Sequence, residues 1–171
     1  MNSSERIRLD QFSIGDFDRG ASRVKELTRM CVKAFVLQIH FPLPSSFRAF
    51  VLRCFGAKVG KGVVIRSGVN ITYPWKLTLG DHCWIGEDVL ILSLAHVTIG
   101  EHSCISQRVF LCTGSHDFSK TTFDLIARPI VIEPSCWIAA CAFVGPGSIV
   151  PAGTMIKANA TVTAKDLQVE A

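Results

Sequence analysis

What this sequence lacks excludes several classes of protein. No stretch of its 171 residues approaches the roughly 18 consecutive apolar residues of a membrane-spanning helix, and the richest run, AFVLQIHFPL, is short and ends in prolines. The seven cysteines are odd in number and show no CxxC spacing, which argues against a disulfide framework and against a zinc ribbon. The first ten residues, MNSSERIRLD, are polar and charged, so no secretory signal is expected. These absences favour a reduced, cytoplasmic setting.

Charge is also scarce and unevenly placed. Charged residues make up 19% of the chain and hydrophobic residues 49%, which is typical of a packed globular domain. Residues 1–58 hold ten Lys or Arg against five Asp or Glu, whereas residues 59–171 hold eight against nine. The net charge of +4 therefore belongs to the N-terminal third. No nucleic-acid partner is expected.

A sixfold periodicity governs the chain from residue 59 onward. Written in sixes, the sequence reads VGKGVV, IRSGVN, ITYPWK, then LGDHCW, IGEDVL, ILSLAH, then IGEHSC, ISQRVF, LCTGSH, with an aliphatic residue first in each unit. The fifth position holds a small or β-branched residue in most units and is Ser115 in the last of them. Two inward positions per six residues do not fit the period of an α-helix. The pattern predicts short strands that meet at corners.

A second period of 20 residues lies above the first. It relates Ile65 to Ile85 and Ile105, and it predicts that such residues stack in columns roughly 4.8 Å apart. After an interruption the sixes resume at Ile132 and run to Leu167 as two coils of 18 residues. The chain should therefore form about five coils of a triangular parallel β-helix.

The interruption, residues 117–131, reads DFSKTTFDLIARPIV and carries no sixfold pattern. A solenoid tolerates insertions at its corners, so this segment is expected to leave the coil as an extended loop, directly after His116. The domain division predicted from these patterns is a helical cap or arm over residues 1–58, followed by a β-helix over residues 59–171.

Residues 1–58 have a helical rather than a sixfold pattern. Apolar residues at spacings of three and four predict an amphipathic helix over residues 22–40, and a second helix is expected from Ser45 to a C-cap at Gly56. Two roles remain open for this region. It could cover the exposed strand edges of the first coil, or its basic balance could bring it to the inner face of a membrane or to an amphipathic acceptor.

Several segments together resemble the hexapeptide-repeat O-acetyltransferases, the group that includes galactoside and maltose acetyltransferases. They are the sixfold pattern, TGSHD before the loop, CWIAA after it and the terminal IKANATVTAKDL. The segments FSIGDFDRGASRVKELTRMCVKAF and ISQRVFLCTGSHD resemble the colanic-acid-biosynthesis type in particular. The resemblance implies an all-β, left-handed parallel β-helix that forms a homotrimer. It further implies that acetyl-CoA and a sugar or glycan-precursor acceptor bind in clefts between neighbouring helices.

The reaction implied by this resemblance is acetyl transfer from acetyl-CoA to a sugar hydroxyl, on a precursor of an exopolysaccharide or related surface glycan. A free alcohol is a poor nucleophile, and a histidine that changes protonation state near neutral pH suits its activation. By the resemblance His116 is this base, and no covalent enzyme intermediate is expected. Cys83 and Cys136 are predicted to face inward, which disfavours a cysteine nucleophile.

Other interpretations of the histidines remain open. His116 occupies the same place in its unit as His96 one coil earlier, so it could fill a solvated corner. His82 and His102 are also stacked by the repeat and could bind a metal, as in the trimeric γ-type carbonic anhydrases. That family has two histidines five residues apart, a pair that is missing here, and no metal is expected. A noncatalytic trimeric scaffold is the remaining alternative.

The resemblance also implies further site residues. Those expected to contact the CoA are Trp137, Ala140, Ala158 and Lys165. Trp137 follows the loop and either packs beside the catalytic histidine or covers the core at a corner. Lys165 lies in AKD where relatives have TKD. Those expected to meet the acceptor are Tyr73, Glu87, Asp88 and Asp117. The first three are predicted to be exposed corner residues, whereas Asp117 either orients His116 or begins the loop.

Overall fold

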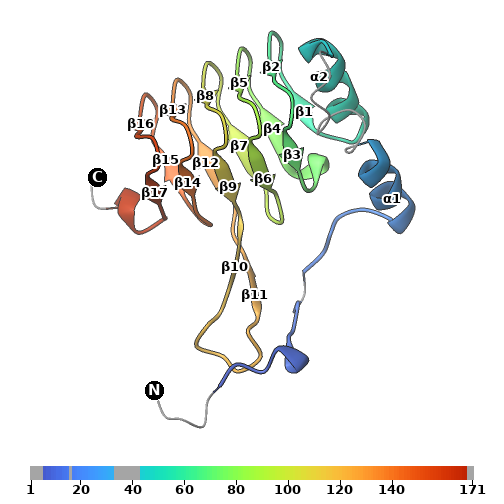
Figure 1. Cartoon of the computed structure of the whole chain (residues 1–171), viewed down its shortest axis with the longest axis vertical. Coiled ribbons are helices and arrows are strands. Elements are labelled where there is room, and N and C mark those ends of the chain that lie inside the picture. Colours follow the sequence, from blue (N-terminus) through green and yellow to red (C-terminus); the bar gives the residue numbers. More distant parts are fainter. Residues whose placement is uncertain (1–5, 16, 33–42, 169–171) are drawn as a thin grey trace.

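The computed structural model describes residues 6–15, 17–32 and 43–168, and most of these form a parallel β-solenoid (Figure 1). Each coil visits three parallel sheets in turn, named A, B and C below. Sheet A contains β1 (Lys58–Val59), β4 (Leu77–Leu79), β7 (Val97–Ile99), β12 (Ile130–Ile132) and β15 (Ile149–Val150). Sheet B contains β2 (Val64–Ile65), β5 (Trp84–Ile85), β8 (Cys104–Ile105), β13 (Trp137–Ile138) and β16 (Met155–Ile156). Sheet C contains β3 (Asn70–Ile71), β6 (Leu90–Leu92), β9 (Phe110–Cys112), β14 (Phe143–Val144) and β17 (Thr161–Val162).

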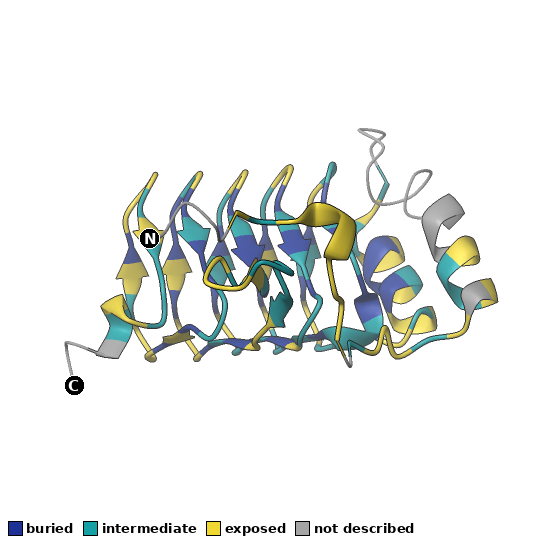
Figure 2. Ribbon diagram, turned by 90° about the horizontal axis from the view of Figure 1, so that it is seen from below, coloured by how far each residue is buried: buried dark blue, intermediate teal, exposed yellow. Residues whose placement is uncertain are grey.

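The predicted columns of aliphatic residues are confirmed by the strand register. Ile65 pairs with Ile85 and Ile85 with Ile105, and the column continues through Ile138 to Ile156. All five side chains are buried, and Figure 2 shows the buried stretches repeating along the row of coils. Burial of an aliphatic side chain of this size contributes about 1.5–3 kcal/mol. The repeated columns therefore form one continuous core that holds the corners in fixed positions.

The glycine that follows the aliphatic residue in several units has a steric reason. A Cβ atom added to Gly80 would lie 2.4 Å from the backbone nitrogen of Glu101 in the next coil. Gly60, Gly86 and Gly100 meet the same obstacle, with backbone atoms of the next coil 2.4–2.7 Å from an added Cβ. The repeat thus uses glycine where successive coils approach too closely for a side chain.

Two α-helices precede the solenoid in the described part of the chain. Helix α1 (Arg23–Val32) falls within the predicted helix over 22–40, and residues 33–40 of that prediction lie outside the described part of the chain. Helix α2 (Ser45–Cys54) matches its prediction, and Gly56 follows it with a φ of +93°. Arg48, Ala49 and Leu52 of α2 are buried. None of the described helices is long and apolar enough to cross a membrane.

Helix α2 covers the open edge of the first coil, as one of the two predicted roles requires. The Arg53 guanidinium donates to the carbonyl oxygens of Val59 and Gly60 at 2.8–3.0 Å, and the Ser45 hydroxyl donates to Ile65 O at 3.1 Å. These carbonyls belong to the first coil, and among the described strands none precedes β1 or β2 in its sheet to donate a hydrogen bond to them. Helix α2 thus lies on the edge of the first coil, whereas membrane contact through residues 1–58 stays a prediction.

The predicted loop over residues 117–131 is a two-stranded antiparallel hairpin that extends away from the coils (Figure 1). Its strands are β10 (Gly114–His116) and β11 (Leu125–Ala127). The predicted bounds need two corrections. The chain leaves the coil at Gly114, so Ser115 is exposed rather than inward, because it pairs with β11 instead of a neighbouring coil. The solenoid resumes at Ile130, which pairs with Val97 of the preceding coil.

Candidate active site

His116 lies on the hairpin, outside the solenoid, and the hairpin emerges from the corner that joins sheet C to sheet A, called the CA corner below. Its Cα pairs with Leu125 across the hairpin, and its side chain is exposed. The base of the hairpin is closed by Thr113, whose carbonyl accepts from Arg128 N at 2.9 Å and whose hydroxyl donates to Leu92 O at 2.6 Å. The rigid core thus fixes where the hairpin starts.

The imidazole of His116 has one polar contact that determines its chemistry. Its Nδ1 lies 3.1 Å from the carbonyl oxygen of Phe123. A carbonyl oxygen only accepts, so this hydrogen bond requires the proton on Nδ1. The neutral ring then keeps a lone pair on Nε2, the atom that can remove a proton from a hydroxyl group. The partner that orients His116 is therefore a backbone carbonyl.

Two phenylalanine rings hold the imidazole from its sides. Phe123 stacks on it with ring centroids 4.3 Å apart and an interplanar angle of 3°, and Phe12 lies 5.5 Å away at 59°. Phe123 has a φ of +50°, a left-handed conformation that a non-glycine residue adopts only at a cost of about 1–3 kcal/mol. The strained backbone places both the ring and the carbonyl of Phe123 against His116. Neither phenylalanine was among the site residues predicted from the sequence.

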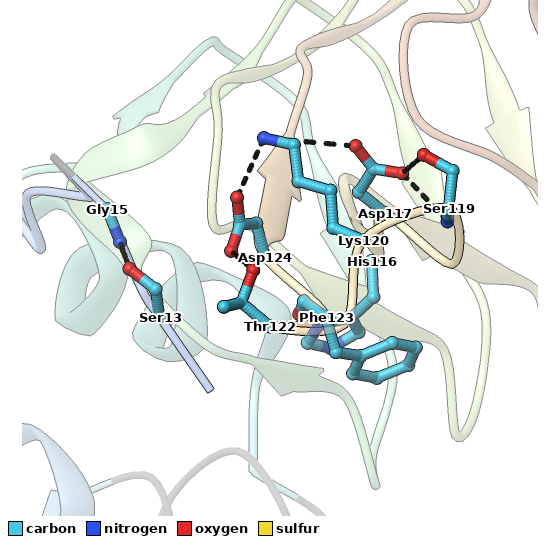
Figure 3. A network of polar contacts seen from close by, with 9 residues as sticks. All are labelled: Ser13, Gly15, His116, Asp117, Ser119, Lys120, Thr122, Phe123 and Asp124. Carbon is cyan, nitrogen blue, oxygen red and sulfur yellow. Dashed lines mark hydrogen bonds and ion pairs between the residues drawn. The ribbon is translucent and has the colours of Figure 1, made fainter. Parts of the chain in front are cut away.

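Asp117 belongs to the tip of the hairpin rather than to the imidazole (Figure 3). Its Oδ1 accepts from the amide and the hydroxyl of Ser119 at 3.0 and 2.5 Å, and these hydrogen bonds lower the pKa of Asp117. Asp124 accepts from Lys120 at 2.8 Å and from Thr122 at 2.6 Å, and its pKa is lowered by these two contacts in that order. Asp117 therefore begins the hairpin turn, whereas its contact with the acceptor stays a prediction.

A pocket of about 480 Å³ lies between the hairpin, the CA corner and the N-terminal residues. Residues directly opposite each other in a hairpin point to the same face, and so do residues two apart along a strand. Leu125 and Ala127, which line the pocket, are consequently on the same face of the hairpin as His116. Lys76 and His96 also line it. The ammonium of Lys76 donates to Asp18 O and Leu94 O, both at 2.7 Å, and burial lowers its pKa.

Tyr73 is near this pocket, but the expectation that it is exposed is wrong. Its side chain is buried, with ring centroids 5.2 Å from Trp75 and 6.4 Å from Phe17. Its backbone nitrogen donates to the hydroxyl of Ser93 at 2.8 Å. The chain brings residues 17–20 across this corner and covers the tyrosine. The six-residue repeat describes only the coils, so it could not predict that residues 17–20 would bury Tyr73.

Trp137 lies on the outer face of sheet B. Its side chain is 49% exposed, and its indole nitrogen donates to the hydroxyl of Ser106 at 2.9 Å. The same outward column of sheet B holds Trp84, which is 60% exposed, and Met155. A groove of about 530 Å³, lined by Trp84, Glu87 and Ser106 among others, runs beside this column. Such an aligned row of exposed large apolar side chains is typical of a binding surface.

The predicted site residues divide into two sets that one chain does not bring together. Tyr73, His116, Asp117 and Lys165 belong to the CA corner or to the hairpin that leaves it. Trp137 lies on sheet B, whereas Glu87, Asp88, Ala140 and Ala158 lie at the corner that joins sheet B to sheet C. Sheet B is the side of the triangular coil that the CA corner does not touch. Figure 1 shows the hairpin extending away from the side that carries β13. Within a single chain, Trp137 is therefore not beside His116.

The predicted site residues at the corner between sheets B and C lie above one another in the stacked coils. The amide of Asn159 donates to Ala140 O at 3.0 Å, which places Ala158 and Ala140 in adjacent coils of one corner. Asp88 has a φ of +56° and lies 3.9 Å from the Arg108 guanidinium. Ala158, Glu87 and Asp88 are exposed. Of these corner residues, Glu87 lines the sheet B groove.

The remaining predicted stack, His82 with His102, is also present. Their rings lie 5.1 Å apart with an interplanar angle of 20°. In the part of the chain that the structure describes, no group of three or more His, Cys, Asp or Glu is arranged to hold a metal ion. The stack on its own offers two nitrogen ligands, fewer than a catalytic zinc site uses.

The inward cysteines are buried, as predicted. Burial raises the pKa of the Cys83 thiol and that of the Cys136 thiol. Both donate to carbonyls of the next coil, Cys83 to Gly100 O at 3.0 Å and Cys136 to Pro151 O at 3.1 Å. A buried, protonated thiol is a poor nucleophile, so these cysteines pack the core.

Comparison with known proteins assigns the family. No family model matches the chain. It is 47% identical over 154 residues to the "Putative colanic acid biosynthesis acetyltransferase WcaF" of Escherichia coli K12, covering 90% of this chain and 85% of that protein. It is 32% identical over 93 residues to nodulation protein L of Rhizobium meliloti, covering 53% of this chain and 51% of that protein. The chain belongs to the hexapeptide-repeat acetyltransferases.

Solved structures have the same fold. A hexapeptide-repeat acetyltransferase of Vibrio cholerae, in complex with acetyl coenzyme A, superposes with a TM-score of 0.76 at 23% identity, covering 90% of this chain and 85% of that one. A maltose O-acetyltransferase of Clostridium difficile gives a TM-score of 0.63 at 17% identity, covering 84% and 85% of the two chains. These structures confirm the resemblance noted in the sequence for the fold, and the E. coli relative confirms it for the family.

Proposed function

We propose that this acetyltransferase moves the acetyl group of acetyl-CoA to a hydroxyl group of a sugar or glycan precursor, with His116 as general base. The observation that carries the proposal is the hydrogen bond from His116 Nδ1 to Phe123 O, which leaves the Nε2 lone pair available. The name of the E. coli relative supports an acceptor from exopolysaccharide synthesis.

Under this proposal the acceptor hydroxyl attacks the thioester of acetyl-CoA directly. Nε2 of His116 takes the hydroxyl proton as the sugar oxygen attacks the thioester carbonyl, and the thiolate of CoA leaves as the acetyl ester forms. The imidazolium then returns the proton to the departing sulfur. Because the Cys83 and Cys136 thiols are buried and protonated, neither is expected to form an acetyl-cysteine intermediate, and direct attack on the thioester is proposed.

We further propose that the site is shared by two subunits of a homotrimer. One subunit supplies His116 and Lys165 from its CA corner, and its neighbour supplies Trp137, Ala140 and Ala158 for the acetyl-CoA. This arrangement is supported by the placement of the two sets on different sides of one coil, and by the exposed apolar column of sheet B. Glu87 and Asp88 would then contact the acceptor from the neighbour's side.

The acceptor is proposed to enter by the pocket on the His116 face of the hairpin, where Lys76 and His96 offer polar groups. The test is a screen of free, nucleotide-linked and lipid-linked sugars with acetyl-CoA, read by release of free CoA and by mass spectrometry of the product. A product heavier than its acceptor by one acetyl group at an oxygen supports the proposal. Acetylation confined to amino groups would contradict it.

A further inference from the structure

We propose that the N-terminal arm, residues 6–15 and 17–22, is a positioning element for the base and that Phe12 is the residue through which it acts. This inference rests on the proposed function of His116, since it concerns how that imidazole is held. It adds a distant segment of the chain to the active site.

The hairpin needs such support because a two-stranded ribbon is marginally stable in water on its own. Its tip has a local network around Asp124, but the strands themselves project from the coils without a sheet behind them. His116 stands on this exposed ribbon. A base placed there would sample several side-chain orientations unless a further segment restrained it.

The arm supplies that further segment by contacting the hairpin along its length. At the tip, Arg8 N donates to Thr121 O at 2.8 Å, and farther along Leu125 N donates to Ser13 O at 3.1 Å. Leu125 is the residue paired with His116. Between these two backbone contacts, the ring of Phe12 lies against the imidazole, 5.5 Å from it. The arm's side-chain contribution at the base is therefore Phe12.

The other end of the arm is fastened to the solenoid. The Trp75 indole nitrogen donates to Arg19 O at 2.7 Å, and the Lys76 ammonium donates to Asp18 O and lies 4.8 Å from the Phe17 ring centroid. The arm thus connects a corner of the first coils to the tip of the hairpin (Figure 1). The hairpin itself leaves the solenoid from the third coil. It acts as a brace, and it forms one wall of the pocket on the His116 face.

Phe12 and Phe123 together restrict the imidazole. Phe123 covers one ring face in parallel stacking, while Phe12 approaches at 59°. Rotation of the imidazole away from Phe123 would break the Nδ1 hydrogen bond that selects the tautomer. Phe12 is itself 41% exposed, so its truncation removes little core packing. The expected effect is therefore on the orientation of His116 rather than on the solenoid.

The experiment compares Phe12→Ala, the conservative Phe12→Leu and the control Phe118→Ala in the full-length chain. Phe118 is a 64% exposed residue of the same hairpin. Misplacement of a catalytic group by about 1 Å can cost up to about 100-fold in rate, so Phe12→Ala should lower kcat by about tenfold or more. The KM for acetyl-CoA should stay within about twofold, Phe12→Leu should recover most of the rate, and Phe118→Ala should match the wild type.

A second readout does not depend on any acceptor. Proton–nitrogen correlation spectra of the imidazoles distinguish the two neutral tautomers, and the His116 signals are those missing in His116→Asn. We expect the Nδ1–H form in the wild type and in Phe118→Ala, and a mixture of tautomers in Phe12→Ala. An unchanged His116 spectrum or an unchanged kcat in Phe12→Ala overturns the inference. Failure of the wild type to acetylate any hydroxyl would instead overturn the proposed function.

Discussion

At the scale of single residues, the sequence indicated His116 but not what surrounds it. The six-residue repeat ends at His116. Because an insertion can leave a solenoid only at a corner, the end of the repeat indicated this histidine. Phe12 and Phe123 left no such signal: one comes from a segment more than 100 residues earlier, and the other acts through its carbonyl and a φ of +50°. Backbone conformation within an insertion is set by tertiary contacts that no repeat encodes.

The buried cysteine column gives a prediction at this scale. Ser103 stands between Cys83 and Cys136 in the column, and its hydroxyl donates to Glu133 O at 3.1 Å just as Cys136 donates to Pro151 O. Serine should therefore fit at position 136. We expect Cys136→Ser to keep acetyl transfer within about twofold and to change the free energy of unfolding by about 1 kcal/mol or less.

Cys136→Ala is the matched control, since it removes the donor as well as the sulfur. Transfer rates and denaturant unfolding of both variants provide the check. If Cys136→Ser folds normally but transfers no acetyl group, direct attack on the thioester is the wrong mechanism.

At the scale of elements, the strands and α2 could be predicted, whereas the hairpin could not. The six-residue period placed the columns correctly because inward side chains fix it. Inside residues 117–131 that constraint is lost, and pairing of β10 with β11 is decided by the hairpin turn and by the arm. The sequence pattern therefore gave the position of the insertion but not its structure.

The hairpin tip should respond to acid. The pKa of Asp117 is lowered by Ser119 and that of Asp124 by Lys120, so these contacts favour the folded hairpin when the carboxylates are charged. A lowered pKa means that this contribution is complete above the unfolded value, about 4, and is lost as the pH falls through the folded value. The side-chain carboxyl carbon shifts of Asp117 and Asp124 should be constant from pH 7 to about 5 and change below about 4.

Asp124→Asn tests the same contacts at neutral pH, because it removes the charge that faces Lys120. Its hairpin shifts at pH 7 should approach those of the wild type in acid, while amides of the solenoid columns serve as the internal reference. Carboxyl carbon shifts of Asp117 and Asp124 that already change above about pH 6 in the wild type would show that these contacts do not set their titration.

At the scale of the whole molecule, the division of site residues between different sides of the coil leads to a prediction about assembly. If the site is shared, His116→Ala and Trp137→Ala should each be inactive alone but should complement each other when unfolded together and refolded as mixed trimers. Random mixing restores about a quarter of the sites, because each needs one intact member from each of two neighbours.

Native mass spectrometry of the refolded mixture should show three chains per particle. Refolding each variant separately and then combining the products is the control, and that mixture should stay inactive. Absence of any recovered activity in mixed trimers would place all the essential groups on one chain.

The central claim is that Nε2 of His116 is the general base, and the most direct measurement is the rate of acetyl transfer by His116→Ala beside its affinity for acetyl-CoA. Loss of a positioned general base should lower kcat by about 10²–10⁴-fold, with acetyl-CoA bound as tightly as by the wild type. His116→Asn, which can still donate to Phe123 O but offers no basic nitrogen, should be as slow as His116→Ala. Transfer by either variant at the wild-type rate would contradict the account.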